Sequence, residues 1–214
     1  EGNLSDSIEY YNAEKKVDIY HRIIFNDESE KAYVCGIARI PFLVSYGYCL
    51  KASRTNLIYI EQNHKTKKSF LLDSVNKNIS IKFDDTDIYP TVNGAIGIAV
   101  GFTSRITKAQ LPQELKNNTL FISPTIEEER LLVKNQQNLE EIIESIQKIV
   151  DKFSSIENCK SINFFLSVQS SFAIELGRNY QEGMHRNWII HNFDGVSNSY
   201  TWAIELSKER IKKF

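Results

Sequence analysis

Apolar and polar positions along the chain follow two periodicities, one typical of β-strands and one typical of helices. Short apolar or alternating runs predict strands at residues 17–25, 32–38, 56–61, 69–72, 78–83, 95–103, 120–123, 161–168, 187–193 and 200–206. Residues 41–51, 139–153 and 171–180 have the composition and spacing of helices. Strands that alternate with helices in this way predict an α/β fold.

Two signals mark the helical stretch in the middle of the chain. Thr125 is preceded by Pro124 and followed three residues later by Glu128, the spacing of a capping box, which predicts a helix that starts at Thr125. Leu139 begins a series of apolar residues at intervals of three and four, which predicts one buried helical face as far as Phe153. The polar residues 134–138 lie between the two signals and can divide the stretch into two helices.

An internal repeat becomes visible when the chain is shifted against itself by 130 residues. KAYVCGIARIPFLVSYG (31–47) then falls on SINFFLSVQSSFAIELG (161–177) without a gap, and Gly47 aligns with Gly177. After one residue of adjustment LIYI (57–60) aligns with WIIH (188–191), and both copies continue through a polar turn into another strand. The shared order of elements indicates a duplication. The alternative is that any two βαβ units look alike at this level of detail.

A duplication predicts that the two copies pair about a pseudo-two-fold axis. The equivalent strand ends at residues 38–40 and 168–170 then come together. In parallel α/β sheets, ligands bind beyond the carboxyl ends of the strands, where helix N-termini present N–H groups that suit phosphate. Two such ends in one crevice predict a ligand that carries two or more phosphates in a ring.

The composition limits the classes of protein and of partner. Of the 214 residues, 42% are apolar and 25% are charged, which excludes disordered and fibrous proteins. The 26 Lys and Arg nearly balance the 27 Asp and Glu, so no overall charge draws the chain to DNA or to an anionic membrane. The longest apolar stretch, residues 95–102, is far shorter than the roughly 20 residues of a membrane span. Three separated cysteines favour a reducing cytoplasm, and a start at Glu1 without a signal peptide indicates a domain cut from a longer protein.

The C-terminal third resembles a known family. INFFLSVQSSFAIELGR (162–178), WIIHNF (188–193) and YTWAIEL (200–206) are together similar to the closing signature of SAVED domains. That signature has an apolar strand, a small polar turn, a helix ending in Leu-Gly-Arg and a later aromatic strand. The resemblance implies a fold of two fused CARF-like, Rossmann-like halves related by a pseudo-two-fold axis, with mixed sheets and flanking helices. The halves are expected at approximately residues 17–123 and 124–214 of a single sensor domain.

The resemblance also implies a function. SAVED domains are the sensors of effectors in CBASS, the cyclic-oligonucleotide antiphage signalling systems of bacteria. They bind a cyclic di- or trinucleotide, for example a cGAMP-like molecule, and oligomerise to activate a fused effector. We expect that effector upstream of this chain, with an HNH DNA endonuclease favoured over a TIR NADase or a Lon-like protease, and double-stranded DNA contacted only by the effector. The expected location is the bacterial cytoplasm, without contact with a membrane.

No group of residues in the sequence points to catalysis. The four His, at positions 21, 64, 185 and 191, form no paired metal ligands, and no Ser-His-Asp order stands out. We therefore expect no enzyme activity, no metal and no cofactor in this chain, and any metal belongs to the effector. Two alternatives stay open: a CARF-like ring nuclease that cleaves its own cyclic ligand, and an α/β protein-interaction domain without a small ligand.

The candidate ligand-binding residues lie at strand ends and in the first turns of the helices that follow. They are Arg39, Ile40, Pro41, Phe42, Thr103, Arg105, Gln169, Ser170, Ser171, Phe172, Asn192 and Phe193. A guanidinium group at Arg39 can form a forked hydrogen bond with a phosphate or a guanine edge. Phe42 and Phe172 are equivalent in the repeat and can stack on two bases.

Each candidate also has a purely structural interpretation. Arg39 can form a surface ion pair, Ser170 or Ser171 can cap the helix that follows, and Asn192 can form a turn. The two Phe residues can pack in the core, and the glycines of residues 95–101 before Thr103 suit a bulge as well as a ligand.

Two further features of the sequence are interpreted as structural. Arg178 is expected to cap helix carbonyls at the end of its helix, away from a ligand. The basic run HKTKK (64–68) is expected to form a solvated sheet edge, with contact to DNA as the alternative.

Overall fold

The computed structural model describes Glu9 and residues 31–50, 56–63, 65–74, 79–83, 87–206 and 212–213. The strands are β1 (Lys31–Val34), β2 (Asn56–Gln62), β3 (Ser69–Leu71), β4 (Ile81–Phe83), β5 (Ala95–Gly101), β6 (Thr119–Pro124), β7 (Ser161–Ser167), β8 (Asn187–Asp194), β9 (Ser199–Leu206) and β10 (Lys212–Lys213). The helices are α3 (Ile40–Leu50), α4 (Gln136–Ser154) and α5 (Ser170–Arg178), with the 3₁₀ turns η2 (Lys108–Gln110) and η3 (Gln113–Leu115). The strand predicted at residues 17–25 lies outside the described residues.

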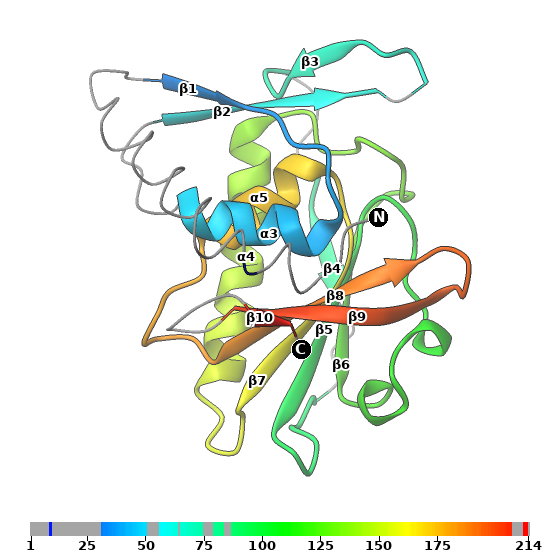
Figure 1. Cartoon of the computed structure of the whole chain (residues 1–214), viewed down its shortest axis with the longest axis vertical. Coiled ribbons are helices and arrows are strands. Elements are labelled where there is room, and N and C mark those ends of the chain that lie inside the picture. The colour runs from blue at the N-terminus through cyan, green and yellow to red at the C-terminus, as the bar shows by residue number, and fades with distance from the viewer. Residues whose placement is uncertain are drawn as a thin grey trace.

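The described strands form two sheets. The larger has the order β10-β9-β8-β7-β5-β6-β4, and the smaller has the order β1-β2-β3 (Figure 1). Neighbours from β8 through β7 and β5 to β6 are parallel, whereas β4, β9 and β10 join the larger sheet antiparallel. Strands β5 and β7 lie in the middle of this sheet and are buried along nearly their whole length, as expected for parallel strands covered on both faces. The mixed α/β architecture confirms the predicted fold class.

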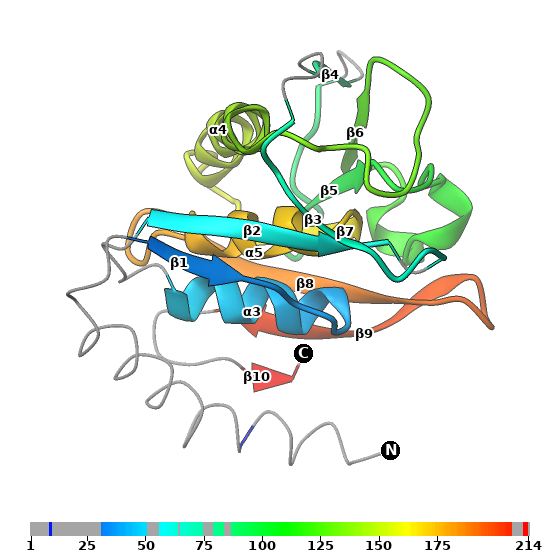
Figure 2. The ribbon, with the colours of Figure 1, turned by 90° about the horizontal axis from the view of Figure 1, so that it is seen from above.

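Helix α4 packs against β7 and α5, as the spacing of its apolar residues predicts. Leu139, Ile142, Ile146 and Val150 form a buried stripe along it. Fully burying such a side chain contributes about 1.5–3 kcal/mol, so the stripe fixes the helix on the sheet. Figure 2 shows the larger sheet twisting from β6 to β9, with α4 packed against β7 in the middle of the sheet and α3 beside β8 and β9.

The capping box at Thr125 does not start a helix, so that prediction was wrong. The Thr125 N–H donates to the Ser80 carbonyl at 2.9 Å and prolongs the pairing of β6 with β4. Leu131 has a φ of 60°, which interrupts a right-handed helix. Helix α4 begins at Gln136 instead, and its N-cap Asn135 accepts a hydrogen bond from the Asn138 N–H at 2.8 Å.

The internal repeat is present in the pairing of the strands. Strand β1 pairs with β2 in parallel, with Lys31 opposite Asn56. Strand β7 pairs with β8 in parallel, with Ser161 opposite Asn187. These four residues are equivalent in the shifted alignment, so the two copies share one register. We refer to residues 31–71 as the first repeat and to residues 161–206 as the second.

Helices α3 and α5 are also related by the repeat, and they touch at their glycines. A Cβ on Gly47 would overlap the backbone carbonyl of Ile174, and a Cβ on Gly177 would overlap the backbone carbonyl of Val44. Residues 44 and 174 are themselves 130 positions apart, so the contact is reciprocal. This reciprocity confirms the pseudo-two-fold axis, which passes between the two helices. Figure 1 shows α3 and α5 side by side between the smaller sheet and strands β8 and β9.

Each repeat also packs its helix against the other repeat. Helix α3 contacts β8 and β9, and α5 contacts β2. One continuous apolar core therefore runs through both copies. The pseudo-symmetric arrangement brings the ends of β1 and β7 together, because the residues after each strand lead directly into the paired helices.

Candidate functional site

A groove lies where the strand ends of the two repeats meet. It consists of two adjoining hollows of about 600 and 280 Å³. Both are lined by Ala38 and Ile40 at the start of α3, by Val168 before α5 and by Thr103 after β5. Ala38 and Val168 are equivalent in the repeat. We call this the inter-repeat groove; it is the crevice that the duplication predicts.

Most of the candidate ligand-binding residues line this groove. They are Arg39, Ile40, Thr103, Gln169, Ser170, Asn192 and Phe193. Pro41, Phe42, Ser171 and Phe172 do not line it, and Arg105 lines a different hollow. The candidates therefore fall into residues that line the groove, residues in the first turns of α3 and α5 that do not line it, and Arg105 at the other hollow.

Arg39 is exposed at the smaller hollow. Its guanidinium group forms no hydrogen bond and no ion pair with any residue that the structure describes. The charge of Arg39 acts on Asp194, whose pKa is lowered mainly by hydrogen bonds from Ser197 and Val196 and to a smaller extent by Arg39. The surface ion pair is therefore absent between described residues, and the guanidinium group is available to an anion.

Gln169 is the repeat equivalent of Arg39, but its side chain is used within the protein. Its Oε1 accepts from the Val133 N–H at 3.0 Å, and its Nε2 donates to the Val133 carbonyl at 2.8 Å. Nε2 also lies 3.0 Å from the Ser171 hydroxyl and 3.4 Å from Glu61 Oε1. The side chain therefore holds residue 133 against α5, and this structural role was missed at the sequence level.

A carboxylate occupies the start of α5. The backbone N–H of Ser171 donates to Glu61 Oε1 at 2.6 Å, and both residues are buried. A helix N-terminus carries a partial positive charge, which Glu61 already compensates. The sequence analysis expected a phosphate at this helix N-terminus. In the structure the carboxylate of Glu61, from the first repeat, lies there instead. Ser170 stays partly exposed in the larger hollow.

The paired phenylalanines pack against other aromatic rings and do not line the groove. Phe172 is fully buried, and its ring centroid lies 5.1 Å from that of Phe102, so it has no free face for a base. Phe42 is half-buried and packs against Trp202 with the ring centroids 6.0 Å apart. Pro41 is buried in the first turn of α3. The core-packing interpretation therefore holds for Phe172.

Sequence reasoning missed several residues of the larger hollow. They are Glu61, Asn63, Lys65, Glu129 and Arg130. Glu61 carried a signal, because it is the repeat equivalent of Asn192. Lys65 belongs to the basic run that was interpreted as a solvated edge, yet it lines the hollow. Residues 129–130 carried no signal, since they lie in the segment for which a helix was predicted.

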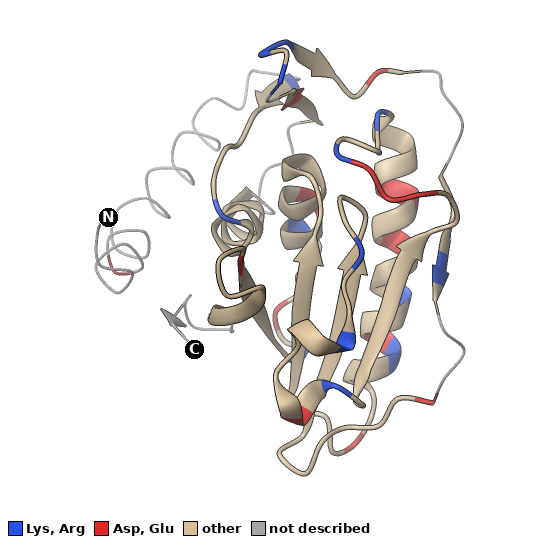
Figure 3. Cartoon of the chain, turned by 90° about the vertical axis from the view of Figure 1, so that its right-hand side faces the viewer, with Lys and Arg blue, Asp and Glu red and all other residues tan. Residues whose placement is uncertain are grey.

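A separate hollow outside the inter-repeat groove, of about 640 Å³, lies on the face of the larger sheet opposite α4. It is lined by Arg105, Lys82 and Lys108 above Ala99 and Phe121. No repeat-related elements meet there, so the duplication gives it no counterpart. Figure 3 shows Lys and Arg interspersed with Asp and Glu over this side of the molecule, in keeping with the balanced composition.

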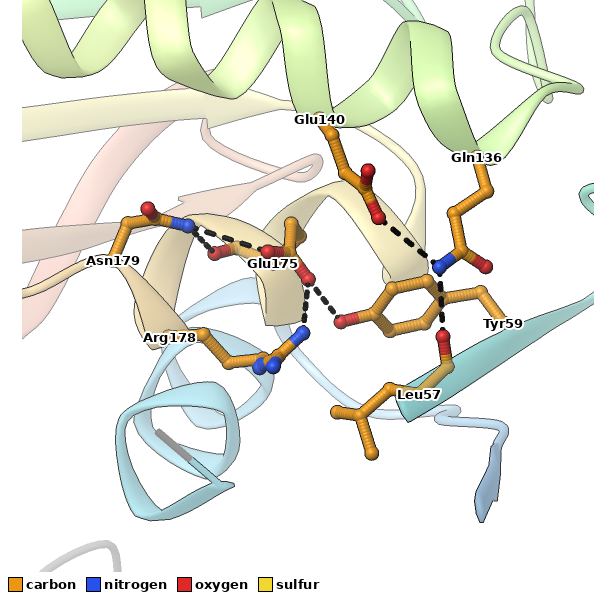
Figure 4. A network of polar contacts seen from close by, with 7 residues as sticks. All are labelled: Leu57, Tyr59, Gln136, Glu140, Glu175, Arg178 and Asn179. Carbon is orange, nitrogen blue, oxygen red and sulfur yellow. Dashed lines mark hydrogen bonds and ion pairs between the residues drawn. The ribbon is translucent and has the colours of Figure 1, made fainter. Parts of the chain in front are cut away.

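The Leu-Gly-Arg end of α5 has a structural role. Arg178 Nη1 donates to Glu175 Oε2 at 2.8 Å, and the Tyr59 hydroxyl of β2 donates to the same oxygen (Figure 4). Burial and the neighbouring carboxylate raise the pKa of Tyr59, so the hydroxyl keeps its proton. Glu175 thus joins α5 to the sheet of the first repeat, and Arg178 pairs with this carboxylate. The sequence analysis expected Arg178 to cap helix carbonyls, and among the described residues it does not.

Within the part of the chain that the structure describes, no group of three or more His, Cys, Asp or Glu side chains is arranged to hold a metal ion. The same part contains no helix that is both long and apolar enough to cross a membrane.

Among the solved structures that resemble this chain are receptors with SAVED domains. The chain resembles an Acinetobacter baumannii Cap4 SAVED/CARF-domain containing receptor with the cyclic trinucleotide 3′3′3′-cAAA, with a TM-score of 0.64 and 16% sequence identity over 93% of this chain and 43% of that one. It resembles the same receptor with 2′3′3′-cAAA (TM-score 0.62, 16% identity, 93% and 43% covered). It also resembles a Moraxella osloensis Cap4 SAVED/CARF-domain containing receptor (TM-score 0.59, 16% identity, 92% and 41% covered). The chain therefore spans less than half the length of these receptors.

The sequence matches a family model as well. Residues 18–206 match the SAVED family, described as the SMODS-associated and fused to various effectors sensor domain. A comparison with curated proteins finds no match. The family model covers most of the chain and includes both repeats, and the receptors share their fold with it. The chain belongs to the SAVED family of sensor domains.

Proposed function

We propose that this chain binds a cyclic oligonucleotide in the inter-repeat groove. The observation that carries the proposal is the meeting of two equivalent strand ends around one groove, with the unpaired guanidinium group of Arg39 at its side. Phosphates in a ring suit such a groove, because Arg39 and the N-terminus of α3 both favour negative charge. Lys65 and Arg130 at the larger hollow add two cations at its rim.

A cyclic trinucleotide is the first ligand to test, and a cGAMP-like dinucleotide is the second. The larger hollow alone has about 600 Å³, within the range of about 300–1,000 Å³ typical of small-molecule sites. The two Acinetobacter baumannii receptor structures contain cyclic trinucleotides of adenine, which supports this order of tests.

Ligand binding is further proposed to drive self-association and to activate an effector fused upstream, with a DNA endonuclease as the favoured effector. The two repeats present unequal faces, and a head-to-tail contact between copies joins two different faces. The setting is the bacterial cytoplasm, in antiphage defence. A ligand can act as a switch only when it binds the assembled state more tightly than the free state.

Titration calorimetry with 3′3′3′-cAAA and with its linear form tests the proposal. We expect the cyclic form to bind more tightly, because the ring holds its phosphates in the spacing of the groove before binding. Equal affinities of the two forms would contradict it, as would the absence of binding by any cyclic di- or trinucleotide. Light scattering during the titration should show a growing mass. Linear products after prolonged incubation would favour the ring-nuclease alternative.

A further inference from the structure

Glu61 is a buried carboxylate that lines a groove proposed for a polyanion. It is 4% exposed, and its Oε1 is held at the start of α5 by the Ser171 N–H. Its Oε2 has no hydrogen-bond partner or ion-pair partner among the described residues. Glu61 lines the larger hollow, so Oε2 is the atom left to contact a molecule bound there.

The repeat equivalent of Glu61 has a different chemistry. Asn192 lies near the end of β8 as Glu61 lies near the end of β2, is 3% exposed and lines the smaller hollow beside Arg39. An amide carries no charge, and its Nδ2 donates to the Phe193 carbonyl at 3.2 Å. The two ends of the groove are therefore unequal: one combines a neutral amide with an unpaired guanidinium group, and the other presents a buried carboxylate.

This inequality assigns different parts of a cyclic oligonucleotide to the two ends. Phosphates are attracted to Arg39 and repelled by Glu61. An ionised carboxylate only accepts hydrogen bonds, and a buried one requires a donor when a ligand excludes water. The donors of an oligonucleotide are the N–H groups of its bases and the hydroxyls of its riboses. Base amino groups suit a carboxylate well, as the pairing of Glu or Asp with a cytosine amino group shows.

We propose that Glu61 determines base specificity, by accepting a hydrogen bond at Oε2 from an amino group of a base in the larger hollow. This inference rests on the proposed function, because it concerns the same groove and the same class of ligand. Arg39 then orients the phosphates, and Glu61 discriminates between bases. A base without an amino group leaves Oε2 unpaired and binds more weakly.

The test compares two cyclic ligands on three proteins by calorimetry. The ligands are 3′3′3′-cAAA and the analogue in which purine replaces each adenine, so that shape and stacking stay and only the amino groups are lost. The proteins are the wild type, Glu61→Gln and Glu157→Gln. Glu61→Gln keeps an oxygen for the Ser171 N–H and loses the charge at the groove. Glu157→Gln loses the same charge at an exposed residue after α4 that lines neither hollow of the groove.

We expect the wild type and Glu157→Gln to prefer 3′3′3′-cAAA over the purine analogue by about tenfold or more, the value of a charged hydrogen bond. In Glu61→Gln that ratio is expected to fall below about threefold.

An unchanged ratio in Glu61→Gln would overturn the inference while the proposed function stands. If a 2′-deoxy form of 3′3′3′-cAAA abolishes the effect of Glu61→Gln and the purine analogue does not, the carboxylate contacts ribose and the inference also fails. If no cyclic ligand binds the wild type, the proposed function and the inference fall together.

Discussion

The two repeats share the register of their strands and differ in what surrounds them. Strand β1 of the first repeat lies at the edge of the smaller sheet, whereas β7 of the second lies between β5 and β8. Their sequences follow these positions: β1 is KAYV with Tyr33 63% exposed, and β7 is SINFFLS with a fully buried Phe164. Backbone register and helix contact therefore survive in both copies, while side chains have diverged with their environment.

The divergence is sharpest at the groove. Arg39 has no partner among the described residues, and its equivalent Gln169 is fully engaged with Val133. Glu61 reaches across to α5, whereas its equivalent Asn192 bonds to its own neighbour. Equivalent positions thus differ in whether the side chain is engaged within the protein. Variants at equivalent positions can test whether this difference is real.

The largest effect is expected at the helix contact, where the repeats are most alike. Ala at Gly47 would place a Cβ on the carbonyl of Ile174, and Ala at Gly177 would place one on the carbonyl of Val44. Overpacking of this kind costs roughly 1–3 kcal/mol or more, and because both obstacles are backbone atoms we expect each variant to lose about 3 kcal/mol. Urea unfolding measures both losses.

The control for the glycine variants is Gly195→Ala, since a Cβ there meets nothing within 4 Å. We expect its free energy of unfolding to stay within about 0.5 kcal/mol of the wild type, as for other surface changes. A large loss in only one of Gly47→Ala and Gly177→Ala would show that the two helices do not depend on each other equally.

The next effect concerns a position that holds a titratable side chain in the second repeat and an apolar one in the first. His191 aligns with Ile60, is buried, stacks on Phe165 and lies 2.9 Å from Asn163 Oδ1 through Nε2. Burial lowers its pKa to about 4, whereas an unfolded His titrates near pH 6.5. Between these pH values the unfolded chain binds a proton at His191 and the folded chain does not. The contribution of neutral His191 to the free energy of unfolding is therefore complete above about pH 6.5 and is lost as the pH falls toward 4. The loss amounts to about 2 kcal/mol by pH 5.

Urea unfolding of the wild type and of His191→Gln at pH 7 and pH 5 measures this loss. His185 also has a pKa lowered by burial and contributes with the same sign in both proteins. The comparison between the proteins therefore isolates His191. Equal losses between pH 7 and pH 5 in both proteins would contradict the burial argument.

Arg39 and Gln169 provide a third test, because they are equivalent in sequence and opposite in expected role. Arg39→Ala should weaken binding of 3′3′3′-cAAA about tenfold or more and leave the melting temperature unchanged. Gln169→Ala should lower the free energy of unfolding by about 1.5–2 kcal/mol, since the N–H and carbonyl of Val133 lose their partner. Calorimetry and thermal unfolding of both variants separate the roles. A Gln169→Ala protein of unchanged stability and weakened binding would instead assign Gln169 to ligand binding.

The sequence was sufficient where short-range pattern determines structure. The spacing of Ile142, Ile146 and Val150 predicted the buried face of α4. The shift of 130 residues predicted a pseudo-two-fold axis between the copies, which the reciprocal contacts of Gly47 and Gly177 confirm. It also placed residues 38–40 and 168–170 at one groove, since equivalent strand ends must meet near the symmetry axis.

Contacts between distant residues were not predictable in this way. Glu61 bonds to a backbone N–H 110 positions away, and its role depends on how the repeats cross. The capping signal at Thr125 loses to sheet pairing with Ser80, which the local sequence does not contain. Phe172 aligns with Phe42, yet Phe102 from another strand buries it completely.

The smallest effect is expected from the polar link between α5 and the sheet of the first repeat. Tyr59→Phe removes the hydroxyl that donates to Glu175, while Arg178 and Asn179 still bond to that carboxylate. Since the charge keeps two partners, we expect a loss of about 1 kcal/mol in the free energy of unfolding. Tyr33→Phe removes the same atom from an exposed residue of the same sheet and should cost less than about 0.5 kcal/mol. Urea unfolding compares the two variants, and equal losses would mean that the link adds nothing to the pairing of the repeats.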